Sequence, residues 1–370
     1  MDRLKVVFRA DASVEIGIGH VMRCLTLADE LTAQGAHCHF ICRAHTGNLI
    51  EQIRSRGYQV HPLQVVTGIA GNPGADRGIY GYWLGASQAE DAAACAALLE
   101  SIRPDWLVVD HYALDQQWEG SIAGLSRKLM VIDDLADRAH QCDLLLDQSL
   151  GRSPQDYCRW VPAHCRLLCG VQHALLRPDF SALRGDSLQR RAAFALRNVL
   201  ITMGGVDKDN VTGRILSVLE TLSLATISRV TVVMGATAPW LEEVRAQART
   251  LPFSTEVKTN VSNMAELMAA SDLAIGAAGA TSWERCCLGL PTLMVVLAEN
   301  QVFAARQLAA TGAVLTLALD ETLGRDLARY LEQASGDPSM LEQMSQQARK
   351  IVDGSGCRVV AQVMAESEKD

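Results

Sequence analysis

A glycine turn that ends in a histidine is the first stretch of the chain suited to chemistry. Gly17-Ile-Gly19-His20 follows the apolar run 5–10 and precedes the amphipathic run 21–31. A strand, a glycine loop and a helix start together present backbone N–H groups to an anion. His20 adds a side chain that exchanges a proton near neutral pH. Two readings stay open, because the loop could equally be a tight turn whose histidine caps or packs.

The richest polar motif of the second half comprises Gly279, Thr281, Ser282 and Glu284. It follows a strand-like run and begins a helix, so backbone N–H groups and two hydroxyls could hold a diphosphate. The Glu284 carboxylate, one turn further on, could accept both hydroxyls of a ribose. It could instead form a capping box with Thr281, and both readings stay open.

Two further stretches follow strand-like runs of the same half. Gly204-Gly205 would let a phosphate or sugar approach the backbone, although a tight turn explains two glycines equally well. Asn300-Gln301 opens a helix after the next run. Because open parallel sheets bind ligands beyond the carboxyl ends of their strands, we expect Asn300 and Gln301 on the same crevice edge as Glu284.

Polar residues also gather where three strand-like runs of the first half end. These are Asp110-His111-Tyr112, Asp133-Asp134 and the run 147–149. With His20 following the first strand, they predict one shared crevice. Asp133 and Asp134 could instead cap the next helix.

The order of these runs predicts an α/β protein with two doubly wound Rossmann-like domains facing an interdomain cleft. We predict a first α/β domain at 1–180, a linker at 181–197 and a second α/β domain with a helical tail at 198–370. The run 66–86 is a loop that either binds ligand or is solvated slack. Expected strands are 5–11, 37–43, 58–64, 105–111, 128–134, 143–149, 198–203, 229–234, 254–259, 273–277, 291–297 and 313–317; expected helices in the first half are 20–34, 46–56 and 88–102.

Composition excludes several classes of function. The formal net charge of the 370 residues is −8, which argues against general nucleic-acid binding. No apolar run is long enough to cross a membrane, and no signal peptide is visible. Eleven cysteines without such a signal predict free thiols and a cytoplasmic location. The cysteines and histidines of 37–45 alternate between strand faces, so a metal site is not expected there.

Several motifs resemble the UDP-2,4-diacetamido-2,4,6-trideoxy-β-L-altropyranose hydrolases of pseudaminic acid biosynthesis. The most discriminating are Phe8-Arg-Ala-Asp-Ala-Ser13, Ile16-Gly-Ile-Gly-His-Val-Met-Arg-Cys24 and Val109-Asp-His-Tyr112. The second half also resembles the UDP-sugar-binding domain of the glycosyltransferase that adds N-acetylglucosamine to lipid I. Other matching motifs are Tyr82-Trp-Leu-Gly85, Asp133-Asp134, Leu175-Leu-Arg-Pro-Asp-Phe180, Thr202-Met-Gly-Gly205, Gly279-Ala-Thr-Ser-Trp-Glu284 and Glu299-Asn-Gln301.

The resemblance implies a GT-B-like fold, with a sugar-binding and catalytic domain at 1–180 and a UDP-binding domain at 198–370. It also implies that water cleaves the sugar C1–O bond with inversion and that UDP leaves, without a metal or other cofactor. His20 matches the catalytic histidine of that family, and Tyr112 matches a tyrosine beside it. The glycosyltransferase pattern implies uracil at the backbone near Val261, phosphates at Thr281 and ribose at Glu284. The implied partner is the UDP-sugar alone, and the oligomeric state stays open.

This mechanism assigns further roles to the glycine turn. With the better diphosphate site in the second half, Gly17 and Gly19 would let the backbone approach the sugar. Asp11, at the end of the first strand, could orient His20 or simply cap the loop. The alternatives are a glycosyltransferase of the same fold, a non-hydrolysing UDP-sugar epimerase and a nucleotide-sugar-binding protein.

Overall fold

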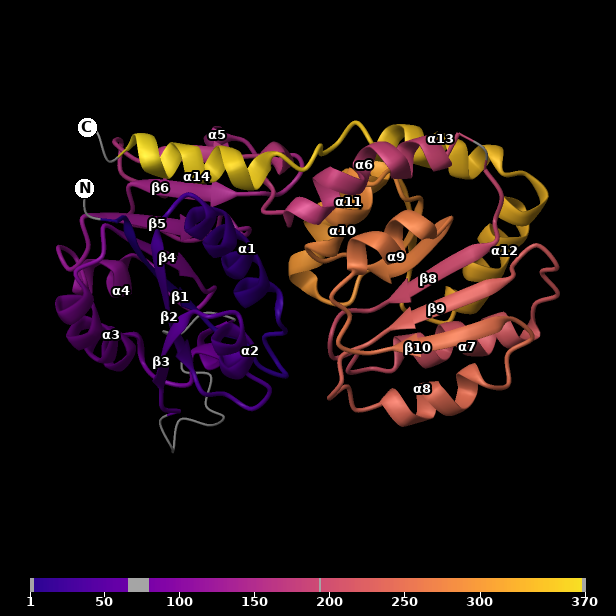
Figure 1. The fold of residues 1–370 in the computed structure, drawn as a ribbon, viewed down its shortest axis with the longest axis horizontal. Coiled ribbons are helices and arrows are strands. Elements are labelled where there is room, and N and C mark those ends of the chain that lie inside the picture. The colour runs from indigo at the N-terminus through magenta and orange to yellow at the C-terminus, as the bar shows by residue number, and fades with distance from the viewer. Residues whose placement is uncertain (1–2, 66–79, 193, 368–370) are drawn as a thin grey trace. The chain divides into compact units, whose positions relative to one another are not determined.

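The computed structural model describes residues 3–65, 80–192 and 194–367, and the chain divides into two compact units (Figure 1). The first unit comprises Met1–Leu175 and Gly356–Asp370, and the second comprises Leu176–Ser355. All the strand pairs of both sheets are parallel in the part of the chain that is described. The predicted α/β architecture of two doubly wound domains is confirmed.

The first unit is built on a sheet with the strand order β3-β2-β1-β4-β5-β6-β7. Alternate side chains of β1 enter different cores: Val6 and Phe8 pack into one hydrophobic cluster, and Val7 packs into another. Helices therefore cover both faces of this sheet. Its strands are β1 (Lys5–Ala10), β2 (His37–Arg43), β3 (Gln59–Leu63), β4 (Trp106–Asp110), β5 (Lys128–Ile132), β6 (Leu144–Asp147) and β7 (Arg166–Cys169); its helices are α1 (Gly19–Ala33), α2 (Ile50–Ser55), η1 (Gly81–Leu84), α3 (Gln88–Ile102), α4 (Gln116–Ser121), α5 (Pro154–Tyr157), η2 (Val171–His173) and α14 (Gly356–Glu366).

The second unit repeats the design with the strand order β10-β9-β8-β11-β12-β13. Its strand β11 lies between β8 and β12: Gly276 pairs with Thr202 of β8, and Ala277 pairs with Val295 of β12. These three strands therefore end at the same edge of the sheet. Its strands are β8 (Asn198–Thr202), β9 (Arg229–Val233), β10 (Ser254–Lys258), β11 (Leu273–Ala277), β12 (Thr292–Val295) and β13 (Val314–Leu317); its helices are α6 (Pro178–Arg190), α7 (Val211–Thr221), α8 (Leu241–Ala248), α9 (Met264–Ala270), α10 (Thr281–Cys287), η3 (Glu299–Gln301), α11 (Val302–Ala310), α12 (Leu323–Gly336) and α13 (Ser339–Ala348).

The last helix corrects the predicted domain boundaries. The sequence places the whole tail with the UDP-binding domain, whereas α14 packs against α1 and η2 of the first unit. Figure 1 shows the yellow ribbon of α14 beside α1. The apolar stripe of α14 enters the core that contains β1, with Val360 and Met364 fully buried. An amphipathic helix predicts that a face is buried but does not reveal which core buries it.

The region around the predicted linker is more regular than expected. Residues 166–169 form the edge strand β7, and α6 occupies 178–190, so most of the linker at 181–197 is helix within the second unit. Pro178 is the first residue of α6, a position where its missing N–H has no intrahelical partner to lose. Of the predicted loop 66–86, residues 66–79 lie outside the described part, and Gly81–Leu84 forms η1.

We expect Met364→Ala to lower the free energy of unfolding by about 2 to 5 kcal/mol, because it leaves a cavity in the core of the first unit. Urea unfolding followed by tryptophan fluorescence measures the change. Val359→Ala is the matched control, since Val359 lies on the same helix and is 37% exposed. Equal effects of the two substitutions would contradict burial of α14 in the first unit.

Candidate active site

The turn before α1 is closed by its own backbone. The Gly17 N–H donates to the Ser13 carbonyl at 2.9 Å, and the Ser13 N–H donates to the Gly17 carbonyl at 3.3 Å. Gly17 has a φ of +79°, in the left-handed region that favours glycine, whereas Gly19 has no positive φ and starts α1. The turn delivers His20 and Arg23 to one face of α1, because residues three apart are neighbours on a helix.

His20 forms a buried pair with Asp110, the last residue of β4. Its Nδ1 lies 2.5 Å from Asp110 Oδ1; Asp110 is fully buried, and His20 is 8% exposed. An ionised carboxylate only accepts hydrogen bonds, so Nδ1 carries the proton and the neutral imidazole keeps its lone pair on Nε2. No described residue hydrogen-bonds to this Nε2. The pair has the arrangement of an oriented general base.

Arg23 holds the carboxylates on both sides of the histidine. Its Nε and Nη2 donate to Asp110 at 2.6 and 2.7 Å, and its Nη1 donates to Asp134 at 2.6 Å. The Tyr112 hydroxyl donates to the same Asp134 oxygen at 2.9 Å. Burial alone would raise the pKa of Asp110, but the charge of Arg23 and the hydrogen bonds from Arg23 and His20 hold that pKa below its usual value. Asp110 therefore stays ionised.

Two aromatic rings contact the imidazole, and a third packs behind them. Tyr112 meets His20 edge-on, with ring centroids 4.6 Å apart and an interplanar angle of 86°. Trp83 of η1 stacks on Tyr112 at 5.7 Å and meets His20 at 6.2 Å. Tyr80 packs against both Trp83 and Tyr112. Burial, followed by the charge of Asp134, raises the pKa of Tyr112 well above its ordinary value, so its phenol stays protonated at neutral pH.

Asp11 does not orient His20, and that prediction is wrong. Its Oδ1 accepts a hydrogen bond from Arg9 Nη1 at 2.6 Å and another from the Arg43 N–H at 2.6 Å. Its other oxygen lies 3.3 Å from His111 Nε2. Asp11 thus belongs to a separate buried network, and Asp110 of the neighbouring strand takes the predicted role. The sequence marks Asp110 only as one of several polar residues at a strand end.

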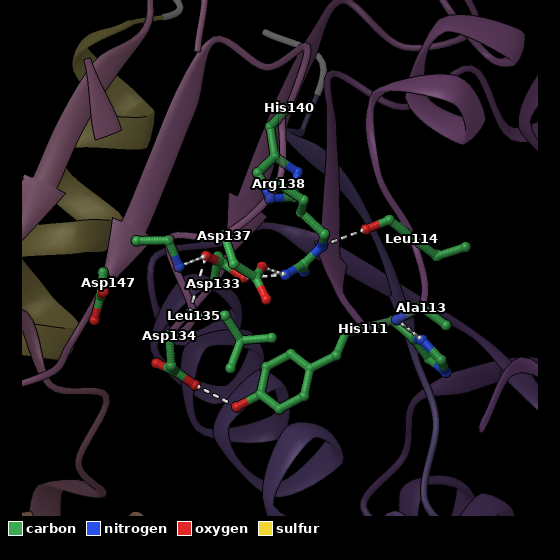
Figure 2. Close-up of polar contacts among 12 residues, drawn as sticks. His111, Ala113, Leu114, Asp133, Asp134, Leu135, Asp137, Arg138, His140 and Asp147 are labelled. Atoms are coloured by element: carbon green, nitrogen blue, oxygen red, sulfur yellow. Dashed lines mark hydrogen bonds and ion pairs between the residues drawn. The ribbon is translucent and has the colours of Figure 1, made fainter. Parts of the chain in front are cut away.

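The paired aspartates after β5 divide between the two readings given to them. Asp133 caps a turn: its Oδ2 accepts the Leu135 and Ala136 N–H groups, and its Oδ1 pairs with Arg138 at 2.8 Å (Figure 2). Asp134 instead accepts the hydrogen bond from the Tyr112 hydroxyl. Only Asp134 therefore joins the candidate active site.

Asp147, at the end of β6, shares a single hydroxyl with Asp133. Tyr157 Oη lies 2.9 Å from Asp133 Oδ2 and 2.8 Å from Asp147 Oδ2. A phenol has one proton to donate, so one of the two carboxyl groups must carry a proton of its own to complete both hydrogen bonds. Burial, followed by the charge of Asp134, raises the pKa of Asp147 to about 7, whereas the pKa of Asp133 is lowered despite its burial, chiefly by Arg138. Asp147, although its Oδ2 also lies 3.3 Å from Arg152 Nε, is therefore the carboxyl group that takes up a proton more readily.

In the second unit, α10 begins at Thr281 without a side-chain cap. Its N-cap residue is Ala280, and the predicted capping box between Thr281 and Glu284 does not form. The Glu284 carboxylate accepts no hydrogen bond from a described residue. Burial raises the pKa of Glu284 to about 7, and the charges of Arg177 and Arg285 act in the opposite direction. The carboxylate is left available, as ribose binding would require.

The other predicted nucleotide-binding residues lie at turns after the strands of this sheet. Gly204 has a φ of +87°, so a tight turn accounts for it, whereas the Gly205 carbonyl accepts the Gly235 N–H from the segment after β9 at 3.0 Å. Gln301 braces the turn after β12, since its Oε1 accepts the Leu297 N–H at 2.9 Å. Asn300 precedes it in η3. Val261 lies partly exposed in the turn after β10.

Other features bear on the predicted partners. No helix in the described ranges is long and apolar enough to span a bilayer. Within those same ranges, no group of three or more histidine, cysteine, aspartate or glutamate side chains is arranged as metal ligands. All eleven cysteines are free thiols.

The fold and the second unit define the class of this protein. Residues 198–356 match the glycosyltransferase family 28 C-terminal domain. The crystal structure of MurG from Acinetobacter baumannii superposes with a TM-score of 0.68 at 15% identity, covering 99% of this chain and 100% of that one. The chain therefore has a GT-B-like fold, as predicted.

Comparison with curated proteins confirms the resemblance to the UDP-sugar hydrolases that the sequence motifs predict. The chain is similar to the UDP-2,4-diacetamido-2,4,6-trideoxy-β-L-altropyranose hydrolase of Campylobacter jejuni, with 26% identity over 310 residues, 84% of this chain and 97% of that protein. It is also 25% identical over 303 residues to an uncharacterized protein of Methanocaldococcus jannaschii, over 81% of this chain. The chain spans only 56% of the length of that second relative.

We expect Asp147→Asn to stabilise the protein at pH 8 but not at pH 4. A folded-state pKa of about 7, above the ordinary 3.8, means that the stability contributed by the Asp147 proton is complete below pH 4. This contribution is lost as pH rises from about 4 to 7, because the folded state must then release the proton or lose the hydrogen bond. Asparagine keeps the shape and a donor at every pH, so the expected gain at pH 8 is of order 1 to 3 kcal/mol.

Urea unfolding at the two pH values measures this difference. Asp143→Asn is the control, because the Asp143 side chain precedes the same strand and is 38% exposed. A gain in stability that is equal at both pH values would contradict a protonated Asp147.

Proposed function

We propose that the protein hydrolyses the C1–O bond of UDP-2,4-diacetamido-2,4,6-trideoxy-β-L-altropyranose. Water attacks the anomeric carbon with inversion, and UDP and 2,4-diacetamido-2,4,6-trideoxy-L-altrose are released for pseudaminic acid biosynthesis. The similarity to the Campylobacter hydrolase over 97% of that protein supports the proposal. The free thiols of all eleven cysteines support a cytoplasmic location.

The observation that carries the proposal is the unengaged Nε2 of His20. Asp110 fixes the proton on Nδ1, and Arg23 keeps Asp110 ionised. The lone pair on Nε2 is therefore held in one direction. A lone pair of this kind can orient a water molecule and remove its proton as the C1–O bond breaks. The imidazolium that forms is stabilised by the Asp110 carboxylate. One base acting on one water implies direct displacement and therefore inversion.

Tyr112 has a positioning role in this scheme. Its hydroxyl is tied to Asp134, and its ring edge packs at 86° to the imidazole plane. The ring keeps His20 from rotating about its side-chain bonds. The hydroxyl connects the ring to the same Arg23 that orients the base.

The leaving group would be held by the second unit. UDP carries its negative charge without a proton, so donors at the diphosphate lower the barrier as the charge develops. Thr281 and Ser282 supply hydroxyls at the start of α10, and the free Glu284 carboxylate suits the two ribose hydroxyls. The glycosyltransferase family 28 match over 198–356 supports this assignment, with uracil at the backbone near Val261. Gly204, Gly205, Asn300 and Gln301 would form the edges of that site.

We expect His20→Ala to lower kcat by about 100- to 10,000-fold while UDP still binds, because the base is lost and the nucleotide site is intact. Asp110→Asn should cause a loss in the same range, since the amide no longer fixes the productive tautomer. Released UDP measures turnover, and calorimetry measures UDP binding.

His164→Ala is the control for both substitutions, because His164 lies in the same unit with its side chain 66% exposed. We expect it to retain normal turnover. Near-normal kcat in His20→Ala would refute the assignment of His20 as the base.

A UDP-sugar-dependent glycosyltransferase of GT-B type is the alternative function, favoured by the family 28 match and by the superposition on MurG. Incubation with the UDP-sugar alone separates the two functions. A hydrolase releases UDP at its full rate, whereas a transferase needs an acceptor.

In ¹⁸O-labelled water we expect the label in the sugar and none in UDP, because water attacks carbon in the proposed reaction. Mass spectrometry of both products reads the outcome. Label in UDP would mean attack at phosphorus and would rule out the proposed chemistry.

A further inference from the structure

Arg285 of α10 is a buried cation that contacts the first turn of its own helix. It is 1% exposed. Its Nη2 donates to the Ala277 carbonyl at 2.7 Å and to Ser282 Oγ at 3.0 Å, and its Nη1 donates to Thr281 Oγ1 at 3.3 Å. Gly276 makes room for it, since a Cβ there would lie 2.4 Å from Nη1. The guanidinium is thus packed directly beneath the two hydroxyls.

The charge of Arg285 has no ion-pair partner among the described residues, and the Glu284 carboxylate acts on it only from beyond ion-pairing distance. No carboxylate of a described residue lies within ion-pairing distance of it, and its buried Nε has no hydrogen-bond partner. Burial lowers the pKa of Arg285 to about 10, which still leaves it charged at neutral pH.

Arg191 is a second buried arginine of the same unit, and its contacts are those of a residue with a structural role alone. It is 5% exposed and also has no carboxylate partner. Its donors reach the carbonyls of Met268, Ser271 and Leu288, which follow or end helices α9 and α10. A cation is favoured at those negative helix ends. Arg285 lies in the last turn of α10, but its guanidinium reaches back to the first turn, where its acceptors are one carbonyl and two hydroxyls and an anion would offset its charge.

The hydrogen bonds from Arg285 also determine whether the Thr281 and Ser282 hydroxyls act as donors or acceptors. A guanidinium can only donate, so Thr281 Oγ1 and Ser282 Oγ must act as acceptors toward it. Each hydroxyl then still has its own proton to donate, and no described residue accepts either proton. Thr281 is partly exposed, so its proton is available to a ligand, whereas Ser282 is 2% exposed and lies beneath it. Oriented hydroxyl donors above a buried cation match the oxygens of a phosphate group.

We infer that Arg285 is a positioning residue for a nucleoside diphosphate, holding Thr281 and Ser282 as donors toward the diphosphate and supplying the charge that offsets it. This inference rests on the proposed UDP-sugar function. It goes beyond that function by assigning phosphate recognition to a residue that touches the ligand only through the two hydroxyls. In the reaction, the same arrangement would favour departure of UDP.

The test compares the affinities of the full-length protein for UDP and uridine by calorimetry. Their ratio isolates recognition of the phosphates, because uracil and ribose are common to both ligands. We expect Arg285→Met to lower this ratio by about 10- to 100-fold. Thr281→Val should lower it by about tenfold, and the double variant should lose less than the product of the two single effects.

Arg191→Met is the matched control, since it removes an equally buried arginine that contacts only carbonyls. It should lower thermal stability and leave the ratio of affinities unchanged. If Arg285→Met does not fold, Arg285→Lys replaces it in the same cycle, because one ammonium group cannot reproduce the fork that holds both hydroxyls.

The outcomes separate the inference from the function on which it rests. A wild-type protein that binds UDP no better than uridine would refute the proposed nucleotide site itself. A wild-type protein that prefers UDP, with the same preference in the Arg285 variant, would overturn the role of Arg285 alone. Multiplicative effects of the Thr281 and Arg285 substitutions would show that Arg285 does not act through the hydroxyl.

Discussion

The Arg23 guanidinium is the interaction on which the candidate active site depends. One cation pairs with Asp110 and Asp134, and these carboxylates in turn hold His20 and Tyr112. Without Arg23, two carboxylates would lie together in a largely buried site with no compensating charge, and at least one would take up a proton. A protonated Asp110 would no longer dictate which nitrogen of His20 carries the hydrogen. The identity of the base is therefore decided by a residue that need not touch the substrate.

The buried arginines of the two units differ in whether a carboxylate pairs with them. In the first, Arg23 is paired, and the site presents an unshared lone pair at His20 Nε2. In the second, Arg285 is unpaired, and the site presents hydroxyl donors at Thr281 and Ser282. Hydrolysis of a nucleotide sugar requires both a proton acceptor and hydrogen-bond donors, since water must lose a proton while the departing diphosphate must be stabilised. This complementarity gives the proposed hydrolysis a physical basis beyond the resemblance to a known hydrolase.

Local pattern was enough to predict most of the architecture. The strand at 37–43, the helix at 88–102 and the strand at 273–277 agree with the structure to the residue, because apolar runs and a Ser87 cap mark their ends. The edge strand at 166–169 was missed, since four residues between irregular segments carry too little periodicity. The assignment of α14 was also wrong, because an amphipathic stripe does not state which core receives it.

The sequence by itself determined the chemical groups of the candidate site: a histidine after a glycine turn, a tyrosine at a strand end, and two hydroxyls with a carboxylate at a helix start. Residue type and local pattern carry that information. Only the tertiary structure decided the pairings. Asp11 and Asp110 both end strands next to the His20 loop, yet Arg9 and the Arg43 N–H engage one while Arg23 and His20 engage the other. Such pairing depends on strand order and on the direction of the side chains. Because His20 and Asp110 are about ninety positions apart in the chain, no local pattern of residues encodes their contact.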